Sequence, residues 1–128
     1  LLASRDYLDR AGCPKSPSEL KSHECLILGM KSPDTWTFET PRGPVEVLVQ
    51  GRLASTNVQA LLRAARLGMG VARLPVAGAG LDLSGGGEIL PEYTSPGGDL
   101  WGVYPSSRHL SPAVRAFAEF LEHHIGKL

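Results

Sequence analysis

The 128-residue sequence has little cysteine, no excess of charge of either sign and no long apolar run. Its 13 Lys and Arg residues balance 13 Asp and Glu residues, so the chain lacks the basic surface that attracts nucleic acid or an anionic membrane. No run of about 20 apolar residues predicts a transmembrane helix, and no charged segment followed by an apolar run predicts a signal peptide. The chain is therefore a poor candidate for contacting DNA by itself, and we expect no membrane partner.

Cysteine chemistry is limited to Cys13 and Cys25. The two form no C-x-x-C pair, and no histidine stands beside them at the spacing of a metal site. We interpret them as intracellular thiols, with a single disulfide as the alternative. We therefore expect no metal, no cofactor and a cytoplasmic location. Because the chain begins at Leu1 rather than at Met, we also expect it to be a piece of a longer protein.

Hydrophobic periodicity predicts an α/β fold with a mixed sheet and flanking helices. Helices are expected where a capping residue precedes an apolar stripe, and strands where apolar residues alternate or run together. A surface turn is expected at the triple glycine, residues 85–87. The predicted helices cover residues 4–8, 17–21, 56–67 and 112–126, and the predicted strands cover residues 25–28, 35–40, 45–55, 71–75, 89–90 and 100–105.

The segment from Thr56 to Pro75 is a predicted helix that feeds a predicted strand. Thr56 and Gln59 fit a capping box at the start of the helix, and Gly68 fits a left-handed stop at its end. A helix followed by a strand is the second half of a βαβ crossover, so we expect a partly parallel sheet. Gly68 and Gly70 do not indicate a dinucleotide site, because that motif needs the strand before the glycines and the helix after them.

Catalytic motifs are missing from the sequence. None of the four histidines stands in a nucleophile motif, and G-x-S-x-G is absent. Glu119 and Glu122 lie three residues apart on one predicted helix, which favours a solvent-facing strip over a catalytic pair. The sequence therefore predicts no catalytic residue.

The predicted helix start at Thr56 and Asn57 is where the sequence suggests binding chemistry. Backbone N–H groups point outward at a helix start, and the helix dipole favours an anion such as a carboxylate there. The alternative is that Thr56 and Gln59 simply cap the helix. Met30 follows a predicted strand, at the place where open α/β sheets bind ligands. Trp36 is expected in the core.

Five motifs follow one another along nearly the whole chain. They are YLDRAGCPKSPSELKSHECL at residues 7–26, W-x-F at 36–38, GRLASTN at 51–57, ALLRAARLGMGVARLP at 60–75 and VYPSSRHLSPAVRAFAEFL at 103–121. In this order they resemble the effector-binding domain of LysR-type transcriptional regulators. The resemblance implies one lobe of a type II periplasmic-binding-protein-like fold, in which two α/β lobes close on a small effector. Residues 1–4 would be the first crossover strand, 5–98 the second lobe, and 99–128 the second crossover strand with a C-terminal helix of the first lobe.

The resemblance also implies the site. Thr56 and Asn57 would offer hydrogen bonds to an anionic effector, and Met30 and Leu74 would supply apolar walls. Arg73 departs from the small or apolar residue that the family has there. It could bind a carboxylate or point to solvent, and we favour solvent slightly. The residues expected at the effector are Gly29, Met30, Thr56, Asn57, Leu74 and Pro75, with Ser4 and Tyr104 near the hinge.

The function that the resemblance implies is regulatory rather than enzymatic. A small-molecule effector would shift the population of closed lobes, and this shift would reach the DNA through a homo-oligomer, a dimer or tetramer. DNA would be contacted only through a winged helix-turn-helix that this chain does not contain. Two alternatives remain open: a lobe of a periplasmic solute-binding protein, and a lobe of a small α/β enzyme.

Overall fold

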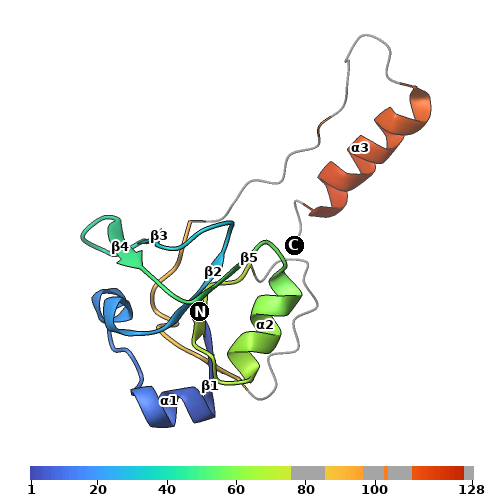
Figure 1. The fold of residues 1–128 in the computed structure, drawn as a ribbon. Helices are drawn as coiled ribbons and strands as arrows, with labels where there is room; N and C mark the ends of the chain where they lie inside the picture. The colour runs from blue at the N-terminus through green and yellow to red at the C-terminus, as the bar shows by residue number, and fades with distance from the viewer. Residues whose placement is uncertain (76–85, 97–102, 104–110, 126–128) are drawn as a thin grey trace.

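The computed structural model describes residues 1–75, 86–96, 103 and 111–125 (Figure 1). The predicted strand at residues 100–105 lies outside the described residues except for Val103. The described elements are β1 (Leu2–Ser4), α1 (Arg5–Ala11), the 3₁₀ helix η1 (Pro17–Ser22), β2 (Cys25–Leu28), β3 (Asp34–Phe38), β4 (Val45–Val49), β5 (Leu53–Ser55), α2 (Val58–Arg66), β6 (Val71–Ala72), β7 (Gly86–Glu88) and α3 (Pro112–Ile125).

The main sheet is mixed, as the sequence predicts. Its strand order is β5-β2-β6-β1-β7, and β2 pairs in parallel with both β5 and β6. β1 runs antiparallel to both of its neighbours, β6 and β7. The parallel part arises because α2 carries the chain from the end of β5 back to the start of β6, which confirms the predicted crossover.

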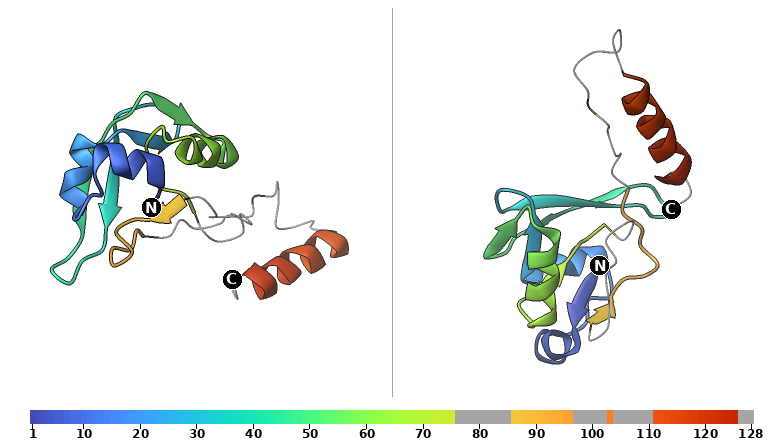
Figure 2. Two further views of the ribbon diagram at one scale, coloured as in Figure 1. Left: turned by 90° about the horizontal axis from the view of Figure 1, so that it is seen from below. Right: turned by 90° about the vertical axis from the view of Figure 1, so that its right-hand side faces the viewer.

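Two apolar layers cover the two faces of this sheet. Successive side chains of a strand point to opposite faces, so Leu26 and Ala72 pack with α2, whereas Ile27 and Val71 pack on the other face. That second face is covered by the antiparallel hairpin of β3 and β4, in which Trp36 pairs with Val47. Figure 2 shows α2 and the hairpin on different sides of the sheet. Trp36, 1% exposed, lies in the core as expected.

The segment after β4 differs from its prediction. We expected one strand through residues 45–55, but β4 ends at Val49 and β5 joins the other sheet. At Gly51 the backbone passes directly against the Cys25 carbonyl, and a Cβ there would overlap it. The glycine is therefore required by close approach to β2.

The strand at the far edge of the sheet was also mispredicted. Gly86 and Gly87 belong to β7, which pairs with β1, and do not form a surface turn. Gly85 lies outside the described residues. Ile89 and Leu90, predicted as a strand, follow β7 as buried residues, and Leu90 has a positive φ of 53°. Pairing with β1 outweighs the low strand propensity of glycine.

Capping residues set both ends of α1, but no side chain caps the start of η1. The Oγ of Ser4 accepts the Tyr7 N–H at 3.2 Å, and Gly12 ends α1. The short helix predicted at residues 17–21 is the 3₁₀ helix η1, where the Ser16 side chain caps no backbone N–H and Glu19 accepts the Lys15 N–H.

α3 stands apart from the sheet (Figures 1 and 2). Ser111 caps this helix, with its Oγ accepting the Val114 N–H at 3.4 Å. Phe117 and Phe120 are 61% and 54% exposed, so the apolar face of α3 has no cover in the described part of the chain. No helix among the described residues has the length and apolar character to cross a membrane.

Candidate functional site

The carboxyl ends of three neighbouring strands meet at one edge of the sheet. Leu28 pairs with Ser55, and Leu26 pairs with Ala72. The chain continues from β2 into Gly29 and Met30, from β5 into Thr56 and Asn57, and from β6 into Arg73, Leu74 and Pro75. We call these seven residues the carboxyl edge. All six residues predicted to contact the effector lie on it.

Hydrogen bonding connects the middle of this edge. The Gly29 N–H donates to the Ser55 carbonyl at 3.0 Å, which places Gly29 beside Thr56. An added Cβ at Gly29 would meet only the Ile27 side chain, at 3.9 Å. The space in front of this backbone is therefore open to a ligand.

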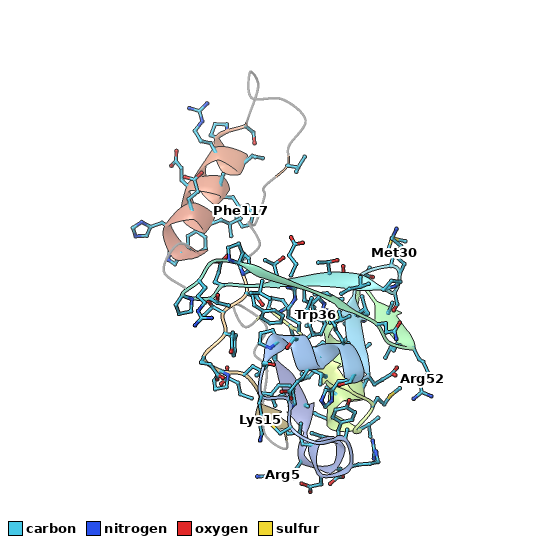
Figure 3. The ribbon with its side chains drawn as sticks, turned by 90° about the vertical axis from the view of Figure 1, so that its left-hand side faces the viewer. Arg5, Lys15, Met30, Trp36, Arg52 and Phe117 are labelled. Atoms are coloured by element: carbon cyan, nitrogen blue, oxygen red, sulfur yellow. The ribbon has the colours of Figure 1, made fainter. Side chains whose placement is uncertain are left out.

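The side chains of the edge differ in exposure. Met30 is 91% exposed and projects away from the sheet (Figure 3), so among the described residues it lines no cavity. Leu74 is partly buried against the apolar layer under α2. Thr56, Asn57 and Pro75 are exposed.

The start of α2 is built differently from the predicted capping box. Asn57, not Thr56, is the N-cap, and its Oδ1 accepts the Ala60 N–H at 3.1 Å. The Asn57 N–H in turn donates to the Ser55 Oγ at 3.1 Å. Within the described residues, the N–H groups of Val58 and Gln59 have no acceptor.

The electrostatics of this helix favour an anion at its start. The first turn of α2 contains no acidic residue, whereas the last turn contains Arg63 and Arg66. The partial positive charge of the helix dipole at the first turn is therefore not neutralised by a side chain of α2.

Arg73 does not point freely into solvent, contrary to the orientation that we favoured. It is half-buried, and its Cζ lies 5.4 Å from the centroid of the Trp36 ring. Burial lowers the pKa of the Arg73 guanidinium, and the charge of Asp34 opposes that change. Sequence alternation could have placed Arg73 on the face of Val71, but the position of Trp36 depends on how the hairpin packs.

Ser4, one of the two residues expected near a hinge, is not brought to this edge. β1 is antiparallel to β6, so Ser4 at its carboxyl end lies at the opposite edge of the sheet. There Ser4 is 3% exposed and caps α1. Tyr104 lies outside the described residues.

The described residues offer little other chemistry. Cys13 and Cys25 are both free thiols, and burial raises the pKa of Cys25 to about 12, so Cys25 stays protonated at neutral pH. The Tyr7 hydroxyl lies 3.0 Å from Nδ1 of His23 and accepts the Glu24 N–H, a contact that the sequence did not reveal. No group of three His, Cys, Asp or Glu side chains in the described ranges could hold a metal ion.

Known proteins similar to this chain are transcriptional regulators. The probable HTH-type transcriptional regulator LtrA of Klebsiella pneumoniae is 31% identical over 127 residues, which are 94% of this chain and 41% of LtrA. The HTH-type transcriptional regulator PtxR of Pseudomonas aeruginosa is 34% identical over 119 residues, 87% of this chain and 38% of PtxR. The chain thus spans about two-fifths of these relatives.

Solved structures show the same fold. The regulatory domain of CrgA, a LysR-type regulator from Neisseria meningitidis, matches 98% of this chain and 63% of its own with a TM-score of 0.66 at 22% identity. Full-length AphB, a virulence activator from Vibrio cholerae, matches 98% of this chain and 43% of its own with a TM-score of 0.64 at 21% identity. The family described as the LysR substrate binding domain matches residues 1–126. This chain belongs to the LysR substrate-binding domain family.

Proposed function

We propose that the chain is part of the effector-binding domain of a LysR-type transcription regulator and that the carboxyl edge binds a small anionic effector. This proposal rests on the first turn of α2, where the N–H groups of Val58 and Gln59 have no acceptor in the described residues. The turn lies beside Gly29, the residue that follows β2. A ligand anion would accept hydrogen bonds from the N–H groups of Val58 and Gln59 and from the side chains of Thr56 and Asn57. Leu74 would contact the apolar part of the ligand.

The proposed division assigns the chain to two crossover strands, the second lobe and a helix of the first lobe. Residues 1–4 are the first crossover strand, 5–98 the second lobe, and 99–128 the second crossover strand and a helix of the first lobe. Two observations support this division. β1 starts at the carboxyl edge, because it is antiparallel to β6. α3 has an uncovered apolar face and stands apart from the sheet.

Signalling would work through lobe closure. An effector that contacts both lobes binds the closed arrangement more tightly than the open one, so it shifts the population toward closure. In the complete protein this shift would change how a homo-oligomer presents its winged helix-turn-helix segments to DNA. The domain would act in the cytoplasm, without a catalytic step, a metal or a cofactor.

Blocking the edge tests this function. In the complete protein that carries the chain, we expect Gly29→Trp to weaken binding of a small-molecule ligand at least about tenfold, because the indole would fill the open space. A panel of small carboxylates, amides, amines and sugars is first screened by thermal shift. Compounds that stabilise the unchanged protein are then measured by calorimetry against the variant.

Met69→Trp is the matched control, because Met69 is 48% exposed and precedes β6 at the opposite edge. This control should bind the same compounds with unchanged affinity. Equal binding to Gly29→Trp and to the unchanged protein would show that the ligand sits elsewhere.

A further inference from the structure

We infer that Arg73 binds the anionic group of the effector and that this group is a carboxylate. The inference rests on the proposed function and names the ligand class of the same site. The sequence left open whether Arg73 binds a carboxylate or points to solvent. Its role follows from its position, its lack of a hydrogen-bond acceptor and its contact with Trp36.

The position of Arg73 is fixed by the sheet. It is the first residue after β6, and the pairing of Leu26 with Ala72 places it beside Ile27, two residues before Gly29. It therefore lies in the same row of strand ends as the rest of the carboxyl edge.

Arg73 has no acceptor in the described part of the chain. The ion pair found there joins Arg52 and Glu24, and no hydrogen bond from the Arg73 guanidinium is formed. A half-buried cation without a hydrogen-bond acceptor loses hydration that the Trp36 ring and the charge of Asp34 replace only in part. Its lowered pKa has the same cause, because desolvation is the largest contribution to it. A ligand anion would supply the missing acceptor.

Trp36 gives the guanidinium a platform. Its ring is 1% exposed, so its position is fixed by the core, and the Arg73 Cζ lies 5.4 Å from its centroid. Attraction between a cation and an aromatic face restricts where the guanidinium can lie. A guanidinium held in this way presents its N–H groups as a fork, which matches the two oxygens of a carboxylate.

The surrounding charges favour a carboxylate over a phosphate. Asp34 on β3 acts electrostatically on Arg73, and Glu88 on β7 also lies near this end of the sheet. Lys31, the other cation close to this edge in sequence, is exposed. A doubly charged phosphate would bring twice the negative charge of a carboxylate against Asp34 and Glu88, so the repulsion at this edge is smaller for a carboxylate.

Matched acid and amide probes test this inference in the complete protein. The probes are benzoate with benzamide, phenylacetate with phenylacetamide and succinate with succinamide. We expect an acid of this panel to bind the unchanged protein and to lose at least about thirtyfold in affinity with Arg73→Gln, as for a charge-assisted contact. Its amide should change less than about threefold. Arg73→Lys keeps the charge and loses the fork. Its affinity for the acid should lie between the affinities of the unchanged protein and of Arg73→Gln.

Arg63→Gln is the control, because Arg63 is exposed on α2 and its replacement removes the same charge from the chain. It should leave the affinity for the acid unchanged. Three results would overturn the inference: full affinity of Arg73→Gln for the acid, an equal loss for acid and amide, or binding only of uncharged or cationic compounds. The last of these would leave the effector function standing, because that function is tested separately by Gly29→Trp.

Discussion

Replacement of Trp36 by alanine is expected to lower the free energy of unfolding by about 3–5 kcal/mol, the range for removal of a large aromatic side chain from a core. Among the described residues Trp36 is the largest fully buried side chain, and it joins the hairpin to the sheet through the apolar layer that contains Ile27 and Val71. Its loss would leave a cavity between two layers that no other side chain of β3 can fill. Arg73 would also lose its platform.

Urea unfolding of the chain, followed by far-ultraviolet circular dichroism, measures this effect. The control is Leu48→Ala on the partner strand β4, where the side chain is 58% exposed. That change should alter stability by no more than about 0.5 kcal/mol. A loss for Trp36→Ala as small as that of Leu48→Ala would mean that the hairpin does not pack on the sheet as described.

Replacement of Gly51 by alanine should destabilise the chain by at least about 3 kcal/mol, at the upper end of the cost of overpacking. The new methyl group would overlap the backbone carbonyl of Cys25, which cannot move without displacing β2. β2 is the strand between β5 and β6, so its displacement disturbs the whole parallel part of the sheet.

Gly29→Ala is the matched control for Gly51→Ala, because the nearest atom to its new methyl group would be 3.9 Å away. The same unfolding experiment should find the stability of this control within about 0.5 kcal/mol of the unchanged chain. Similar stabilities for the two alanine variants would contradict the close approach at Gly51.

The sequence predicted those parts of the fold that local patterns determine. The alternation around Trp36 located β3, and the helix between Asn57 and Gly68 located the crossover. That Gly29, Thr56 and Leu74 share one edge of the sheet was implied by the family resemblance, and the crossover agrees with it. Such an arrangement follows from parallel pairing, whatever the exact ends of the strands are.

What the sequence could not predict depends on long-range pairing. The direction of β1 relative to β6 puts Ser4 at the opposite edge, and no local pattern reveals that direction. β7 contains Gly86 and Gly87, which disfavour strands, and it forms because β1 offers it a partner. The contact of Arg73 with Trp36 joins residues 37 positions apart in sequence through the packing of two separate sheets.

The central claim is that the carboxyl edge receives the ligand, and amide hydrogen exchange of the complete protein tests it most directly. The comparison is between the free protein and the protein saturated with the tightest-binding acid of the probe panel. We predict slower exchange at residues 29–31, 56–60 and 73–75, and no change at residues 12–24, which lie away from this edge. Slower exchange confined to residues 12–24, with residues 56–60 unaffected, would contradict the account.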